Sequence, residues 1–165
     1  MKEVRTNTYK CLRSSVVLLL SIVLCTACTR RELYNDYVDI PAGGWEIQDS
    51  KTFTIDVPAQ GCYDVDMFVR HNSEYKYRNL WLFVDHLSPD SVLTTDTVNI
   101  VLADRYGRWS GGGWGAFRQI EHPINRALPL DSGVHVIKIT QAMREYNLKG
   151  VANVGVKVTA SNDDK

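Results

Sequence analysis

The stretch TFTIDVPAQGCYDVDMFV, residues 52–69, contains two alternating segments separated by a short turn. Apolar side chains occupy every second position in residues 52–57, and the same pattern returns in residues 63–69. With a two-residue period, every second side chain lies on the same face, which is typical of β-strands with one face in a core. Pro58 and Gly61 bracket the turn, so we predict a β-hairpin.

Further short strands are predicted toward the C-terminus from the same kind of pattern, at residues 79–85, 92–102, 117–124, 134–140 and 154–158. Residues 141–150 (QAMREYNLKG) suit a short helix, with Met143, Tyr146 and Leu148 as core contacts and Gly150 as its end. Seven to eight strands without βα alternation indicate an all-β fold. We therefore predict an antiparallel β-sandwich with one short helix near the C-terminus.

The N-terminus has the layout of an export signal. Basic residues precede an apolar run at residues 16–24, which is too short to cross a bilayer of about 30 Å as a helix. The Ala27-Cys28 pair resembles a bacterial lipobox, although Cys25 stands where an aliphatic residue is usual. Ordinary cleavage that leaves a soluble protein is the alternative to lipidation with acyl chains such as palmitate.

These features predict the division of the chain. A lipoprotein signal peptide covers residues 1–27, and a tether lipidated at Cys28 covers residues 28–33. The β-sandwich domain then occupies residues 34–160, and residues 161–165 form a polar tail. With Cys28 lipidated, Cys62 is left without a cysteine partner in the mature chain, so no internal disulfide is predicted.

Charge argues against two classes of partner. The chain has 19 basic and 19 acidic residues, and removal of residues 1–27 takes away four basic residues and one acidic residue. The resulting net charge of −3 favours neither nucleic acid nor an anionic membrane surface as a partner.

Motifs for catalysis and for metal or cofactor binding are missing from the sequence. The glycine-rich stretch LADRYGRWSGGGWGAF, residues 102–117, lacks the Lys-Ser/Thr pair of a P-loop, and no GxSxG elbow occurs. The four histidines lack metal-ligand spacing. Asp64 and Asp66 share one side of a strand, and we interpret them as part of a solvated face rather than a calcium or glycosidase site. We predict no enzyme activity, metal or small-molecule cofactor.

Aromatic residues gather around residues 75–81 and on both sides of the glycine run. Tyr75, Tyr77, Trp109 and Trp114 form the candidate interaction surface, because large rings beside bare backbone suit protein hot spots and sugar stacking. The alternative is that the tryptophans fold back and cap the sandwich. Glycine flanks Trp114 on both sides, so we expect Trp114 to be the exposed anchor and Trp109 to be the cap.

Three blocks of the chain resemble the signature blocks of the GldH family of gliding-motility lipoproteins from the Bacteroidetes. They are RHNSEYKYRNLWLFVD (residues 70–85), LADRYGRWSGGGWG (102–115) and QAMREYNLKGVANVGVKV (141–158). The positions that match the family pattern are Arg70, Tyr75, Tyr77, Asn79, Leu80, Trp81, Ala103, Asp104, Gly107, Trp109, Gly111, Met143, Arg144, Leu148, Gly150, Val154 and Gly155. Within these blocks, Arg70 and Asp104 are candidate loop organisers, joined by an ion pair that would hold the Tyr75 and Trp109 loops together.

The resemblance implies a non-catalytic accessory of the gliding machinery and the associated type IX secretion system. Its partners would be other envelope proteins, and the Cys28 lipid would hold it in the cell outer membrane. The basic residues after Cys28 favour the periplasmic face. The alternative is a carbohydrate- or peptidoglycan-binding module that uses Tyr77, Trp109 and Trp114 for stacking. Because relatives also occur in species that do not glide, the resemblance does not establish movement.

Overall fold

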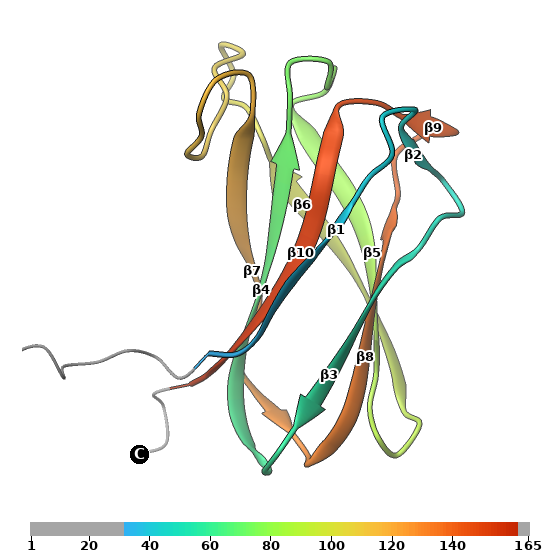
Figure 1. Cartoon of the computed structure of the whole chain (residues 1–165), viewed down its shortest axis with the longest axis vertical. Coiled ribbons are helices and arrows are strands. Elements are labelled where there is room, and N and C mark those ends of the chain that lie inside the picture. Colours follow the sequence, from blue (N-terminus) through green and yellow to red (C-terminus); the bar gives the residue numbers. More distant parts are fainter. Residues whose placement is uncertain (1–31, 162–165) are drawn as a thin grey trace, which may run out of the picture. The chain divides into compact units, whose positions relative to one another are not determined.

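Two four-stranded antiparallel sheets face each other in the computed structural model, which describes residues 32–161 (Figure 1). One sheet has the strand order β1-β10-β4-β7, the other has the order β3-β8-β5-β6, and β2 pairs with β9 in a short ribbon. The strands are β1 (Glu32–Asp39), β2 (Trp45–Glu46), β3 (Lys51–Val57), β4 (Gly61–His71), β5 (Asn79–Leu87), β6 (Leu93–Val101), β7 (Arg118–Leu130), β8 (Gly133–Gln141), β9 (Asn147–Leu148) and β10 (Val151–Ala160).

One hydrophobic core joins the inner faces of both sheets. Phe53 and Leu82 enter it from one sheet, and Met67 and Val156 enter it from the other. Burial of this apolar surface is the main driving force that holds the two layers together. The predicted all-β, antiparallel fold is confirmed.

The predicted hairpin at residues 52–69 is wrong, although both of its strands exist. β3 pairs with β8 in one sheet, whereas β4 pairs with β10 and β7 in the other. The turn at residues 58–60 therefore carries the chain from one layer to the other. Alternation places Phe53, Ile55 and Val57 in the core as expected, but it does not say which strand lies alongside.

The predicted helix at residues 141–150 is also wrong, because the backbone groups of this segment bond to other strands. The Ala142 N–H donates to the Trp81 carbonyl at 2.8 Å. The buried Gln141 side chain accepts from the Met143 N–H at 2.9 Å and donates to the Glu145 carbonyl at 2.8 Å. The segment thus bends until Asn147–Leu148 form β9, and Tyr146 is exposed rather than a core contact. Residues 32–161 contain no helix.

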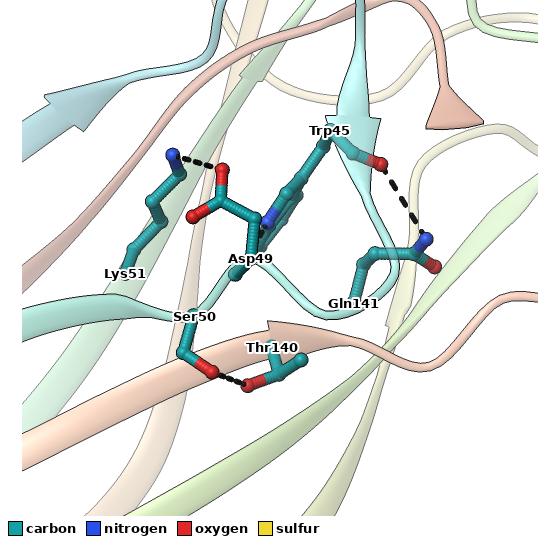
Figure 2. A network of polar contacts seen from close by, with 6 residues as sticks. All are labelled: Trp45, Asp49, Ser50, Lys51, Thr140 and Gln141. Carbon is teal, nitrogen blue, oxygen red and sulfur yellow. Dashed lines mark hydrogen bonds and ion pairs between the residues drawn. The ribbon is translucent and has the colours of Figure 1, made fainter. Parts of the chain in front are cut away.

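A polar network secures the β2–β3 connection against the end of β8 (Figure 2). The fully buried Trp45 donates its indole N–H to the Asp49 carbonyl at 2.6 Å, and Lys51 pairs with the Asp49 carboxylate at 2.7 Å. Ser50 and Thr140 share a hydroxyl hydrogen bond at 2.7 Å. Trp45 therefore lies beside Gln141. Residues 141–150 accordingly run alongside β2 instead of forming a helix.

β7 contains Pro123 and runs to Leu130, past residue 124, where the predicted strand ended. It is an edge strand, and proline is tolerated there because one side of the strand needs no ladder bond. The ladder to β4 is irregular near Val65, and Ala127 has a positive φ of 49°.

This irregular part of β7 covers the outer face of β4. Asp64 and Asp66 are buried rather than solvated, contrary to the sequence interpretation. The Asp64 carboxylate accepts the Ala127 N–H at 3.0 Å, and Asp66 pairs with Arg126 at 2.7 Å. Both aspartates have structural partners on β7, and nothing in their arrangement resembles a calcium site.

β1 is the first strand of the described domain. It begins at Glu32, inside the stretch predicted to be the tether, and ends at Asp39. Cys28 and the signal peptide lie outside the described residues. In the described range, no helix has the length and apolar character needed to cross a membrane.

Candidate interaction surface

Four connections meet at one end of the sandwich, which we call the loop end (Figure 1). They comprise residues 40–44, 72–78, 102–118 and 142–150. Cross-contacts tie them together: the Leu102 N–H donates to the Arg78 carbonyl at 2.7 Å, and the Asn72 N–H donates to the Gly150 carbonyl at 2.8 Å. All the candidate residues from the sequence except Cys28 lie on or beside this end.

The glycine-rich loop is a pinned hairpin rather than a loose connection. The Ser110 N–H donates to the Leu102 carbonyl at 2.8 Å. Gly112 and Gln119 exchange two backbone hydrogen bonds, at 3.1 and 2.7 Å. Residues 113–118 therefore form a closed tip that projects from the start of β7.

Two glycines in this loop are required by close backbone approach. Gly111 has a φ of +83°, and a Cβ there would lie 2.2 Å from the Gln119 carbonyl oxygen. A Cβ on Gly113 would lie 2.1 Å from the Phe117 carbonyl oxygen. By contrast, a Cβ on Gly112 would meet open space. The hairpin closes tightly only because side chains are missing at these two positions.

The two tryptophans of the loop have opposite environments. Trp109 is half-buried, packs against the core and lies with its ring centroid 4.6 Å from the imidazole of the fully buried His71. Trp114 sits at the hairpin tip with 94% of its surface exposed. Trp109 therefore packs on the core, as expected for the cap of the sandwich, whereas Trp114 is exposed to solvent.

The two tyrosines do not form an exposed surface, contrary to the sequence prediction. Tyr75 is a core residue that is 2% exposed, and it donates its hydroxyl to the Asn79 carbonyl at 2.8 Å. Its burial raises the pKa of the phenol. Tyr77 is half-buried and donates to the Glu145 carboxylate at 2.5 Å, a hydrogen bond that raises the pKa of Tyr77. Tyr77 links two loops and leaves little ring surface free.

Arg70 and Asp104 each organise a loop, but not through the ion pair expected between them. The Asp104 carboxylate accepts the Tyr106 and Arg108 N–H groups and pairs with the Arg108 guanidinium at 2.7 Å. The backbone hydrogen bond from Arg108 is the main cause that lowers the pKa of Asp104. Arg70 instead places its guanidinium over the Phe117 ring, 4.7 Å from the centroid.

The loop end is positively charged, although the chain as a whole has no net charge. Its four connections contain seven basic and three acidic residues. Arg105 and Arg108 flank the exposed Tyr106 ring, with guanidinium carbons 4.8 and 5.7 Å from its centroid. This basic cluster was not predicted from the sequence. The two arginines in RYGR, residues 105–108, are the pattern that could have indicated it.

Metal-ligating and thiol groups were compared with the loop end. Among residues 32–161, no group of three or more His, Cys, Asp or Glu side chains lies close enough to hold a metal ion. Cys62 is a free, half-buried cysteine on β4. The arrangement is suited to contact with a macromolecule.

Comparison with known proteins identifies relatives over most of the chain. A family model described as GldH lipoprotein matches residues 32–158. The chain is 25% identical over 159 residues to the gliding motility lipoprotein GldH homolog of Christiangramia forsetii, with 91% of this chain and 97% of that protein covered. It is 23% identical over 155 residues to the gliding motility lipoprotein GldH of Flavobacterium johnsoniae, with 89% and 96% covered.

Similar solved structures include a family 35 carbohydrate binding module from Clostridium thermocellum. The TM-score is 0.40 at 11% identity, with 81% of this chain and 97% of that chain covered. The three sequence blocks that suggested a family all lie within the range matched by the family model.

Proposed function

Since the chain belongs to the GldH lipoprotein family, we propose that it is a lipid-anchored accessory of the gliding motility and type IX secretion machinery that binds another envelope protein through the Trp114 hairpin. The observation that carries this proposal is an almost fully exposed tryptophan on a pinned loop. The anchor is the lipid on Cys28, in the outer membrane and on its periplasmic face. The role is non-catalytic.

The rigidity of the hairpin favours a binding role for Trp114. The bonds between Gly112 and Gln119 and the close packing of Gly111 hold the tip in one conformation before any partner arrives. A preorganised aromatic anchor loses less conformational entropy on binding. Tryptophan is also among the residues most enriched at interface hot spots.

Charge specifies the kind of partner surface. Arg105 and Arg108 are exposed beside the hairpin, and Arg118 donates to the Gly115 and Phe117 carbonyls at its base. An acidic partner surface would complement this end electrostatically and would speed association. We therefore propose that the partner presents a pocket for an indole ring with acidic groups around it.

The alternative of a sugar-stacking module has weaker support in the geometry. Of the three rings it requires, Trp109 packs on His71, and Tyr77 is half-buried and bonded to Glu145. Only Trp114 offers an open ring face. The other exposed ring of this loop, Tyr106, is flanked by Arg105 and Arg108, and such a cationic surface suits a protein contact better than a platform for a neutral glycan.

The test is chemical crosslinking and affinity capture from native membranes, with wild-type and Trp114→Ala chains. We expect Trp114→Ala to weaken capture of the partner by about 2 kcal/mol, roughly thirtyfold, as hot-spot aromatics do. Phe83→Ala is the matched control, because Phe83 is an exposed aromatic in the middle of β5, outside the loop end. If Trp114→Ala recovers the same envelope proteins at wild-type yield, the hairpin is not the binding site.

A further inference from the structure

A cavity of about 290 Å³ lies between the two sheets, away from the loop end. Its lining includes Leu130 and His135, on either side of the β7–β8 turn, whereas the Trp114 hairpin precedes the opposite end of β7. β1 contacts β3 along one side of the sandwich, while β6 and β7 are the outer strands on the other. On this second side Thr94 and Asp96 of β6 are exposed and Ile124 of β7 is half-buried, so we place the mouth of the cavity there.

The floor of the cavity is aliphatic. Eight Ile, Val and Leu side chains line it, among them Ile55, Val84 and Ile137 from one sheet and Val65, Leu128 and Val158 from the other. Among the described residues that line it, the only rings are the imidazoles of His86 and His135. Sugars are held by stacking on aromatic faces, whereas an alkyl chain needs only apolar surface. The floor therefore suits an alkyl chain.

The mouth of the cavity is polar on β6. Thr94 and Asp96 share a strand face with Val98 and the fully buried Ile100. This face changes from apolar to polar where the cavity opens, and Asn125 on β7 adds an amide. An aliphatic interior with a few polar groups at one side is the usual composition of a small-molecule site.

The His86–His135 pair adds a hydrogen-bond acceptor to the lining of the cavity. His135 Nε2 lies 2.9 Å from the Asp131 carbonyl oxygen and must donate to it, because a carbonyl only accepts. His135 Nδ1 then accepts the Nε2 proton of His86 at 2.9 Å, which leaves Nδ1 of neutral His86 as an acceptor. Burial, assisted by the neighbouring His135, lowers the pKa of His86 and so favours its neutral form.

We propose that this cavity binds a single alkyl chain of an amphiphile whose head group is a hydrogen-bond donor, such as a hydroxyl or ammonium, and not a carboxylate. The exposed carboxylate of Asp96 and the acceptor nitrogen of His86 in the lining favour a donor and disfavour an anion. The cavity volume corresponds to about ten water molecules of liquid, comparable to an alkyl chain of about ten carbons. This site is independent of the Trp114 hairpin.

Photo-crosslinking of the full chain in native membranes tests the proposal. The probes are an alkanol, an alkylamine and an alkanoate of about ten carbons, each with a diazirine in the chain. We expect the alkanol and the alkylamine to label the β7 peptide that contains Ile124 and Leu128, and the alkanoate to label it several-fold less. Equal labelling by the alkanoate, or labelling spread over the chain without enrichment in this peptide, would overturn the proposal.

Two variants and one control variant test the cavity and the head-group selection separately. Ile124→Trp fills the cavity from a half-buried edge position and should reduce labelling by the alkanol several-fold. Asp96→Asn removes the charge from an exposed position and should raise alkanoate labelling toward that of the alkanol. Asp56→Asn, on an exposed position of β3 outside the cavity, should leave all labelling unchanged. If Asp96→Asn leaves the alkanoate as poorly bound as before, the proposed head-group selection is wrong, even if Ile124→Trp fails to fold.

Discussion

The indole of Trp109 packs against the imidazole of His71 with a ring separation of 4.6 Å and planes inclined at 57°. His71 ends β4 and is fully buried, so this contact attaches the glycine-rich loop to the core. The loop can expose Trp114 without unravelling because Trp109, five residues earlier, holds its base.

Replacing Trp109 with Ala should destabilise the domain. The change removes packing against His71 and the core, worth about 3 kcal/mol at the low end for a buried tryptophan. We expect the melting temperature of the chain to fall by about 10 °C. Trp114→Ala should leave it within about 1 °C, because that ring is exposed. A Trp109→Ala chain as stable as wild type would contradict the assignment of Trp109 as the cap.

Gly111→Ala should disturb the hairpin and weaken partner capture. The added Cβ would meet the Gln119 carbonyl oxygen, and the positive φ of Gly111 disfavours alanine. Gly112→Ala is the matched control, because a Cβ there meets open space. Partner capture from membranes, measured for both variants, should be reduced only for Gly111→Ala. Equal capture by the two variants would show that hairpin geometry does not matter for binding.

Replacing Cys28 with Ala should abolish lipidation. The acyl chains would be missing, and they anchor a protein because each buried methylene contributes about 0.8 kcal/mol. We expect the Cys28→Ala chain to lose metabolic labelling with palmitate and to lose its association with the outer membrane. A Cys28→Ser chain should behave in the same way. Continued palmitate labelling of the Cys28→Ala chain would place the lipid on another residue.

Stability should decline as the pH falls below about 6.5, the ordinary pKa of histidine. Burial is the main cause that lowers the pKa of His71, and the Arg118 charge lowers it further. The unfolded chain therefore binds a proton at a pH where folded His71 is still neutral, which favours unfolding. The contribution is fully present above pH 6.5 and is lost as the pH falls toward the lowered pKa of the folded state.

Melting temperatures of wild-type and His71→Gln chains between pH 7.5 and pH 5 test this prediction, with the range set by the ordinary histidine pKa. Glutamine does not titrate there, so the variant should lose less stability than wild type over the same interval. The stability of the variant should keep a smaller dependence on pH, because burial also lowers the pKa of His86. Identical slopes for the two chains would exclude His71 as a source of the pH dependence.

Removing Arg126 should cost more stability than removing the whole ion pair with Asp66. The Asp66 side chain is 6% exposed, so Arg126→Met leaves a buried carboxylate without its cation. We expect a loss of about 2 kcal/mol from Arg126→Met, and recovery of about half of it when Asp66→Asn is added. Denaturant unfolding of the two single variants and the double variant measures the coupling. Strictly additive losses would show that the pair does not interact.

The local sequence pattern determined the class of the fold and the inward faces of its strands. Phe53, Ile55 and Val57 are buried as the alternation predicts, because the two-residue period is a property of one strand and needs no knowledge of its neighbours. The contrast between Trp109 and Trp114 was also readable from the chain, since glycines on both sides deprive Trp114 of side chains to pack against.

The tertiary structure alone decided which strands lie together and which polar groups are buried. β3 and β4 are adjacent in sequence but lie in opposite sheets, because strand pairing depends on the shape of the whole core rather than on a short turn. The segment after β8 forms strand β9 with β2 instead of a helix, and the Gln141 side chain there contacts the Trp45 carbonyl, 96 residues away in sequence. Asp64 and Asp66 alternate like solvated residues, yet β7 covers them. In each case the partner is distant along the chain, so no local period or propensity carries the information.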